Sequence, residues 1–238
     1  MGRGLVKTLF PAGPRAPTYA PAYHMRTLDE LLVATHNAGK LGEFGQLLRG
    51  LPLKLRGLKE FPDAVAVEET GQTFAENAAL KARHYSRLTN LWTLADDSGL
   101  EVDALGGRPG VRSARYAGPD ATDAERTSRI VEELAATGDG ERRARFVCVV
   151  ALYQPAAEEL RLFSGKCEGR IASGPRGEGG FGYDPVFIPD GFDKTFGELP
   201  SEVKNRVSHR ARALEGLKSY LLQIFSGRLD PPGEAPIE

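Results

Sequence analysis

Residues 92–110 read WTLADDSGLEVDALGGRPG, an apolar run followed by two adjacent aspartates and a glycine-rich continuation. The first five residues, WTLAD, predict a buried strand. Adjacent carboxylates repel each other and are poor strand residues, so we expect the strand to end at Asp96 and Asp97. Asp-Asp-Ser-Gly is favourable turn chemistry, although a turn explains one aspartate better than two. Ends of strands in α/β sheets are also where functional carboxylates lie.

Segments typical of strands and of helices alternate on either side of this run. Strands are expected at residues 31–34, 53–57, 92–96, 144–154 and 185–189, and a strand or a bent pair of strands at 160–172. Thr73 with Glu76, and Thr122 with Glu125, have the spacing of capping boxes, which predicts two helix starts. A further helical segment follows the first strand. Because the strands alternate with helices and then cluster late, the pattern predicts a mixed α/β sheet.

Composition excludes several classes of protein. The 238 residues carry 31 Lys and Arg against 32 Asp and Glu, so no net field favours nucleic acid or an anionic membrane. The two cysteines form no CxxC pair, which argues against a disulfide scaffold and favours a cytoplasmic location. No apolar run approaches the length of a membrane helix. We expect residues 1–24 to be a disordered leader, 25–226 one domain, and 227–238 a flexible tail.

Two polar loops are candidate ligand sites. THNAGK, residues 35–40, follows the first strand, where backbone N–H groups and the Lys40 ammonium suit phosphate; a plain strand-to-helix turn is an equal interpretation. RGEGGFGYD, residues 176–184, contains GxGxxG but runs into a strand instead of a helix, so we reject a dinucleotide fingerprint. Its glycines indicate unusual backbone angles or close approach to a ligand, and Phe181 and Tyr183 offer faces for a base. A flexible hairpin loop would explain it equally.

The segment EVKNRVSHRARAL, residues 202–214, allows two interpretations. As a single helix it has an apolar stripe, with the basic residues, Lys204 among them, on a solvated face. Alternatively Ser208 caps a new helix, which places His209 and Arg210 in its first turn beside free N–H donors, a corner that suits a nucleotide.

Glu68 and Glu69 precede the helix that Thr73 begins. They could serve only as electrostatic partners of its first turn. Together with Asp96 and Asp97 they could instead form an oxygen site for Mg²⁺, which prefers carboxylates, water and substrate phosphate.

Five motifs in one order carry a family resemblance: THNAGK, EETGQTFAENAALKA, ADDSGLEVDALGGRPGVRSARYAG, GGFGYDPVF and KNRVSHRARAL. Together, over residues 30–222, they resemble the inosine/xanthosine triphosphate pyrophosphatase family. The resemblance implies an elongated, two-lobed α/β fold around a central mixed β-sheet, with a substrate cleft between the lobes, in a homodimer. It also implies Mg²⁺-dependent hydrolysis of ITP, dITP and XTP to the nucleoside monophosphate and pyrophosphate.

The resemblance assigns roles motif by motif. Asp97 is implied as the proton acceptor and a magnesium ligand, with Glu68 or Glu69 supporting the metal. The residues implied to contact the substrate are Thr35, His36, Asn37, Ala38, Gly39, Lys40, Ser98, Phe181, Gly182, Tyr183, Asp184, Lys204, His209 and Arg210. His36 stands where the family often has a small residue, and we expect it to point outward. Asp96 either tunes the charge of Asp97 or only holds the turn.

Two other functions are consistent with parts of this pattern. A related pyrophosphatase acting on dTTP, UTP or modified pyrimidines would share the split α/β shape, but the SHR segment and the FGYD loop favour purines. A nucleotide-sensing module would bind without hydrolysis; Asp97 and the adjacent glutamates argue against it, because binding an anion gains little from carboxylates.

Overall fold

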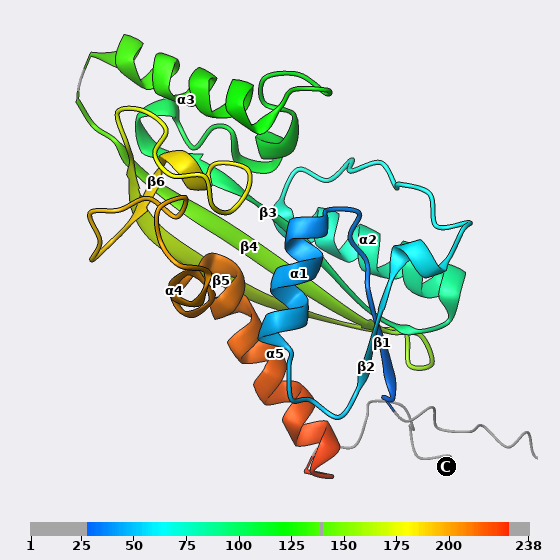
Figure 1. Cartoon of the computed structure of the whole chain (residues 1–238). Coiled ribbons are helices and arrows are strands. Elements are labelled where there is room, and N and C mark those ends of the chain that lie inside the picture. Colours follow the sequence, from blue (N-terminus) through cyan, green and yellow to red (C-terminus); the bar gives the residue numbers. More distant parts are fainter. Residues whose placement is uncertain (1–27, 139, 229–238) are drawn as a thin grey trace, which may run out of the picture.

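A computed structural model describes residues 28–138 and 140–228 and contains one six-stranded sheet (Figure 1). The strand order is β2-β1-β3-β4-β5-β6. The bounds are β1 Glu30–Val33, β2 Lys54–Gly57, β3 Trp92–Val102, β4 Arg143–Gln154, β5 Glu159–Ile171 and β6 Phe187–Pro189. The first three strands in the order pair in parallel and the remaining pairs are antiparallel, which confirms the mixed sheet. The predictions for residues 1–24 and for 229–238 lie outside the described residues.

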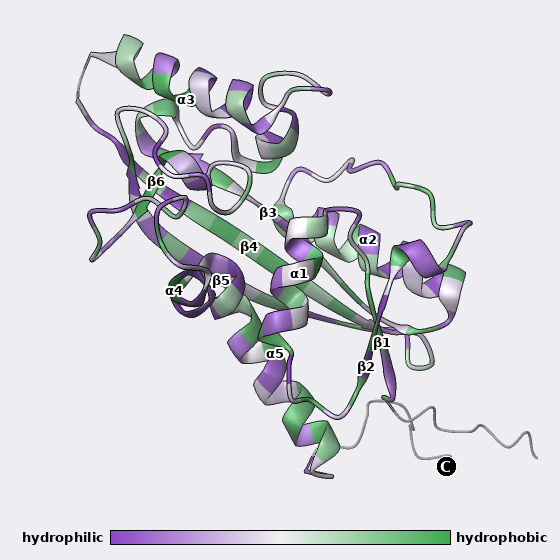
Figure 2. Ribbon diagram, in the orientation of Figure 1, coloured by the Kyte–Doolittle hydropathy of each residue, from purple (hydrophilic) through white to green (hydrophobic). Residues whose placement is uncertain are grey.

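Helices cover both faces of the sheet. They are α1 Ala38–Leu47, α2 Phe74–Thr89, α3 Asp123–Thr137, α4 Ser201–Val207 and α5 His209–Phe225. One apolar core joins α1 and α5 to one face, and a second joins α2 to the opposite face. In Figure 2 the centre of the sheet is hydrophobic, whereas α5 alternates between hydrophilic and hydrophobic residues along its length. No helix of the described ranges is long and apolar enough to span a membrane.

The long strands β3, β4 and β5 run through two lobes, so the molecule is elongated (Figure 1). The lobe drawn at the top holds α3 and β6 over a third apolar core, which includes Leu100, Ile130 and Phe187. The other lobe holds the remaining helices with β1 and β2. The expected two-lobed α/β architecture is therefore confirmed.

Capping residues begin the helices where the sequence predicts. Thr73 accepts from the backbone N–H of Glu76 and Thr122 from that of Glu125, and both capping boxes are complete. Ser208 separates α4 from α5, and its hydroxyl accepts from Ala211 N. The second interpretation of residues 202–214 is thus correct and the single-helix one is wrong, because the Ser208 backbone is extended and interrupts the helix.

The strand expected at 92–96 is longer than predicted. The prediction that Asp96 and Asp97 end it is therefore wrong. β3 continues to Val102, so Asp96 and Asp97 lie inside a strand and form no turn. They pair with Val150 and Val149 of β4. The strand tolerates them because successive side chains point to opposite faces, where each carboxylate meets different partners. The segment expected at 160–172 is one strand, β5, over Glu159–Ile171, and not a bent pair. The strand expected at 185–189 begins only at Phe187, because Asp184–Val186 is a short 3₁₀ helix before β6.

Candidate active site

Asp96 and Asp97 lie at the point where the sheet opens. β1 pairs with β3 as far as Leu94, and the loop of residues 35–37 begins there. The connection after β1 leads to α1 on one face, whereas α2 leads into β3 from the other face. Open α/β sheets bind ligands outside the carboxyl ends of strands where connections diverge in this way.

Asp96 points to the face covered by α1 and α5. Its Oδ2 lies 2.9 Å from Lys40 Nζ and accepts from Arg210 Nη2 at 3.1 Å. Ser98, two positions along the same face, donates to the same Oδ2 at 3.2 Å and accepts from Arg210 at 3.1 Å. Asp96 is 2% and Arg210 1% exposed, so this is a buried ion pair.

The charges continue beyond this pair as an alternating chain. Glu43 of α1 contacts Arg210 and, at 2.7 Å, Lys204 Nζ. Lys204 in turn lies 2.5 Å from Asp184 Oδ2. The six members, Lys40, Asp96, Arg210, Glu43, Lys204 and Asp184, carry three positive and three negative charges; we call them the buried ion chain.

Opposite charges within the buried ion chain keep its central members, Asp96 and Arg210, ionised. Burial alone would raise the pKa of Asp96, but Lys40 and Arg210 hold it well below its ordinary value. Burial would lower the pKa of Arg210, and Asp96 and Glu43 raise it above its ordinary value instead. Asp96 therefore acts as a fixed counter-ion of Lys40 and Arg210 and does not merely hold a turn.

Asp97 points to the opposite face, toward α2. Its Oδ2 accepts from Asn77 Nδ2 at 3.0 Å, and Oδ1 lies 3.5 Å from Lys81 Nζ. Lys81 also contacts Glu69 Oε1 at 2.7 Å, so one ammonium group lies between two carboxylates. Burial raises the pKa of Asp97, and Lys81 offsets part of that rise. A raised pKa makes this carboxylate a stronger base than an exposed aspartate.

The two carboxylates on Lys81 fit the chemistry of magnesium. Among residues 28–138 and 140–228, no group of three or more His, Cys, Asp or Glu side chains could hold a metal alone. Mg²⁺ uses one or two carboxylates plus substrate phosphate and water, which Asp97 and Glu69 can provide. Glu68 is exposed, whereas Glu69 is half-buried on Lys81 and lies 3.7 Å from Arg115. Of the two glutamates, Glu69 is therefore the one that shares a cation with Asp97.

The FGYD loop lies against the loop after β1. The Phe181 ring is so close to Gly39 that a Cβ there would stand 2.6 Å from it, and Lys204 Nζ lies 4.4 Å from the ring centroid. Asp184 is buried and accepts from Phe181 N at 2.8 Å. Phe181 therefore contacts both Gly39 and Lys204 and remains partly exposed, unlike Tyr183.

Tyr183 differs from expectation. Its ring is 4% exposed within the core of the upper lobe, and its hydroxyl donates to Ser113 O at 2.9 Å. The side chain is therefore not available for a base to stack on, because the ring is buried in the lobe and its hydroxyl is already hydrogen-bonded. Gly182, which is partly exposed, donates its backbone N–H to Asp123.

His209 opens α5 and is buried. Its ring stacks on Phe146 with 4.7 Å between centroids, and Nδ1 has no hydrogen-bond partner among the described residues. Burial, followed by the nearby positive charges of Arg210 and Lys204, lowers the pKa of His209. The imidazole is therefore neutral near pH 7.

The segment of residues 35–40 caps α1 and is largely exposed to solvent. Asn37 caps α1 by accepting from Lys40 N at 2.9 Å, while Ala38 is exposed and Thr35 accepts from Asn37 N. His36 is exposed as expected, and its Nε2 lies 3.2 Å from Tyr85 Oη. The first turn of α1 consequently presents backbone N–H groups beside Lys40, an arrangement that favours phosphate.

Sequence reasoning did not identify Glu43, Asn77 and Lys81 as site residues. Each lies on a helix that was expected: Glu43 is one turn from Lys40 and Asn77 one turn from Thr73, whereas Lys81 is about two turns from Thr73. Asn77 and Lys81 are four residues apart and therefore share one face of α2. A polar residue among the alanines of a buried helical face was the available signal.

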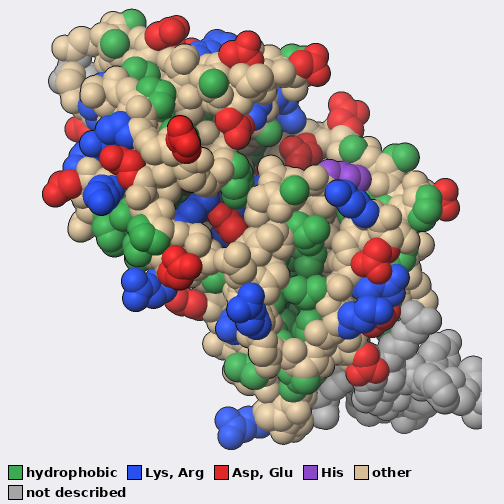
Figure 3. Space-filling view, in the orientation of Figure 1, with side chains coloured by type: hydrophobic (Ala, Val, Ile, Leu, Met, Phe, Trp, Pro, Cys, Tyr) green, Lys and Arg blue, Asp and Glu red, His purple; other side chains and the backbone are tan. Residues whose placement is uncertain are grey.

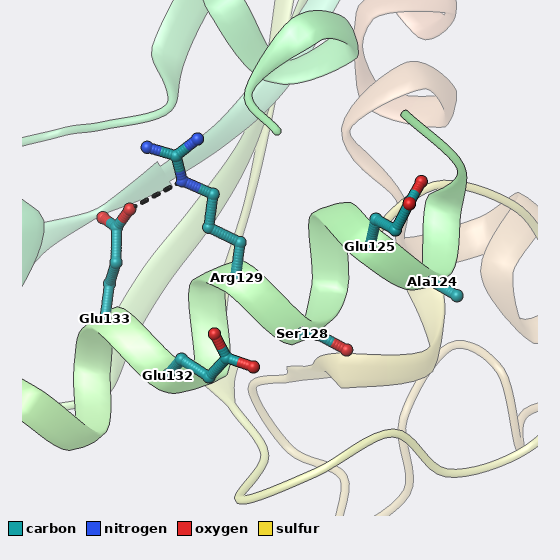
Figure 4. A pocket seen from close by; sticks show the side chains of 6 residues that line it. All are labelled: Ala124, Glu125, Ser128, Arg129, Glu132 and Glu133. Carbon is teal, nitrogen blue, oxygen red and sulfur yellow. Dashed lines mark hydrogen bonds and ion pairs between the residues drawn. The ribbon is translucent and has the colours of Figure 1, made fainter. Parts of the chain in front are cut away.

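The molecule has two hollows of different charge, one between the lobes and one on α3. In Figure 3 acidic and basic side chains meet inside a hollow between the two lobes. Figure 4 shows a second hollow, on the outer surface of α3, where Arg129 donates to Glu133. That hollow is lined by Ala124, Glu125, Ser128, Arg129, Glu132 and Glu133. Its excess of carboxylates disfavours a triphosphate.

Comparisons with known proteins agree with the fold and the motifs. A family model described as the Ham1 family matches residues 31–220. A dITP/XTP pyrophosphatase of Geobacillus kaustophilus is 48% identical over 201 residues, which cover 84% of this chain and 98% of the relative. One of Geobacter sulfurreducens is 50% identical over 194 residues, covering 82% and 97%. The structure of a HAM1 protein from Coxiella burnetii is similar with a TM-score of 0.76 and 46% identity, covering 82% of this chain and 98% of that one.

Proposed function

This chain belongs to the Ham1 family, and we propose that it is a nucleoside triphosphate pyrophosphatase acting on ITP, dITP and XTP. The proposed reaction is Mg²⁺-dependent hydrolysis between the α and β phosphates, which releases the nucleoside monophosphate and pyrophosphate. The observation that carries the proposal is the placement of Asp97 and Glu69 on the shared Lys81, beside the loop after β1. Such an enzyme would remove deaminated purines from the nucleotide pool.

Asp97 is the proposed base. It orients the attacking water and accepts its proton through a carboxylate whose Oδ2 accepts from Asn77 and whose Oδ1 accepts from Ser98 N at 3.1 Å. An ordinary aspartate, with a pKa of about 3.9, is a weak base. Burial raises the pKa of Asp97, whereas a bound cation would lower it. Mg²⁺ held by Asp97 and Glu69 would supply the remaining activation and neutralise developing phosphate charge.

Cations of this chain support the triphosphate. Lys81 lies between the two carboxylates, and Lys40 stands at the first turn of α1. In this structure Lys40 is paired with Asp96, so substrate phosphate would share an ammonium group that already has a counter-ion. The free N–H groups of the first turn of α1 add to the attraction for phosphate.

Base recognition follows from donor and acceptor chemistry. Hypoxanthine and xanthine carry a 6-keto oxygen where adenine carries an amino group. Arg210 provides only donors: its Nη1 and Nη2 already donate to Glu43, Asp96 and Ser98, and Nε has no partner among the described residues. Neutral His209 provides one donor and one acceptor. A donor aimed at position 6 pairs with the keto group but meets a second donor in adenine, and the unpaired buried groups discriminate against it. Phe181 would stack on the base.

One assay tests the proposal against its alternatives. The protein is incubated with Mg²⁺ and, separately, ITP, XTP, GTP, ATP and dTTP, and the products are identified. IMP and pyrophosphate from ITP support the proposal. Preferred hydrolysis of dTTP favours the pyrimidine enzyme, IDP with phosphate indicates another hydrolase, and no product favours a sensor. Asp97→Asn should abolish turnover without unfolding the protein; near wild-type hydrolysis by that variant would contradict the assigned base.

A homodimer, which the resemblance implies, and a cytoplasmic location, which the cysteine usage favours, remain predictions. The molar mass of the purified protein by light scattering tests the homodimer.

A further inference from the structure

Asn77 is an uncharged polar side chain buried among apolar ones in the second turn of α2. It is 0% exposed, and the neighbouring alanines Ala78 and Ala82 of the same helix pack in the apolar core. Burying an amide costs free energy unless its polar atoms form hydrogen bonds. Asn77 forms two, and both lead to segments that carry carboxylates of the candidate active site.

The two hydrogen bonds determine the orientation of the amide. Asn77 Oδ1 accepts from the backbone N–H of Gly71 at 2.8 Å, so Nδ2 is the atom that faces Asp97. Nδ2 donates to Asp97 Oδ2 at 3.0 Å. A backbone N–H can only donate and an ionised carboxylate can only accept, so the reversed amide would satisfy neither partner.

Gly71 belongs to the loop that carries Glu69, and its close approach to Asn77 requires glycine. A Cβ at residue 71 would stand 2.6 Å from Asn77 Oδ1. The loop therefore lies directly on the amide. One helical turn further on, Lys81 contacts Glu69 and Asp97 by charge. Asn77 joins the same two segments by directional hydrogen bonds, which set orientation more strictly than a flexible ammonium group does.

We infer that Asn77 is a positioning residue of the active site: it fixes the Asp97 carboxylate with Oδ1 near Lys81 and fixes the Glu69 loop beside it. This inference rests on the proposed function, because the reaction gives Asp97 its role. The expected consequence is a contribution to turnover and little contribution to nucleotide binding.

The test uses two variants and one control in the full chain. Asn77→Asp keeps an oxygen for Gly71 N–H but turns a second oxygen toward Asp97 Oδ2. Asn77→Ala removes both bonds. Ser86→Ala is the matched control, because Ser86 is 0% exposed on the same helix and its hydroxyl donates only to Leu91 O, away from the site. The readouts are kcat and KM for ITP, Tm, and hydrogen exchange at the Gly71 amide.

We expect both Asn77 variants to lose about 100-fold in kcat, since misplacing a reacting group by about 1 Å costs that much. KM should stay within about threefold, because the interaction acts on the reacting geometry. Exchange at Gly71 should quicken in Asn77→Ala and stay slow in Asn77→Asp. Ser86→Ala should lower Tm and keep the wild-type kcat.

Three results would overturn the inference. They are wild-type kcat in Asn77→Asp, an unchanged Gly71 exchange rate in Asn77→Ala, and an equal loss of kcat in Ser86→Ala, which would indicate general destabilisation of α2. If Asn77→Ala does not fold, Asn77→Asp and the control still decide the matter. Absence of hydrolysis by the wild-type protein would instead refute the proposed function, and the exchange rates would then decide whether Asn77 joins the two segments.

Discussion

Asp96→Asn should destabilise the protein by about 3 kcal/mol, because it leaves the buried ion chain with one excess positive charge. Removing one partner of a buried ion pair costs about 3–5 kcal/mol. Arg210, 1% exposed, keeps Glu43, and asparagine keeps one acceptor oxygen, so we expect the lower end of that range. For a chain of this size the loss corresponds to a fall in Tm of about 6–12 °C.

Urea unfolding at pH 7, followed by circular dichroism, measures the difference. The control is Asp190→Asn, whose carboxylate pairs with Arg143 at the surface with half of its side chain exposed. Exposed pairs contribute about 0–1 kcal/mol, so the control should stay close to wild type. A loss of less than about 1 kcal/mol in Asp96→Asn would refute the claim that Asp96 is the required counter-ion of Lys40 and Arg210.

The same variant predicts a pH dependence. Lys40 and Arg210 hold the pKa of Asp96 below its ordinary value despite burial. The stabilisation by its charge is therefore complete above the unfolded-state pKa of about 3.9 and is lost as the pH falls toward the folded-state pKa. The difference in free energy of unfolding between wild type and Asp96→Asn should be constant from about pH 5 to 7 and shrink below about pH 4. A difference that grows on acidification would contradict the reasoning.

Four further substitutions address the metal, the recognition of the nucleobase and the fold. Glu69→Gln should raise the half-saturating Mg²⁺ concentration by about tenfold or more, whereas Glu68→Gln should leave it unchanged; equal effects would refute the choice between them. Arg210→Ala should narrow the ratio of kcat/KM for ITP over ATP, measured on folded protein, and an unchanged ratio would argue against Arg210 as a base reader. Ser208→Ala should cost about 1 kcal/mol in urea unfolding because α5 loses its cap, and no cost would show that the cap is dispensable.

The sequence predicted the elements whose signals are local. The capping boxes at Thr73 and Thr122 mark helix starts through bonds within four residues, and the apolar run at 144–154 marks a strand by its own composition. Ser208 showed why a local signal can still be ambiguous. Its capping competed with an apolar stripe that continues across it, and only the extended backbone at that residue settled the matter.

Because adjacent carboxylates repel each other, the sequence by itself predicted that a strand ends at the two aspartates. The family resemblance added that Asp97 is the base. Only the tertiary structure showed the strand continuing through both residues. Lys40 and Arg210 reach Asp96 from one face and Asn77 and Lys81 reach Asp97 from the other. These partners lie between 16 and 114 positions away along the chain. The free energy of burying a carboxylate depends on such partners and not on its sequence neighbours. For that reason only the tertiary structure showed that Asp96 is a counter-ion and that Asp97 lies against Asn77 and Lys81.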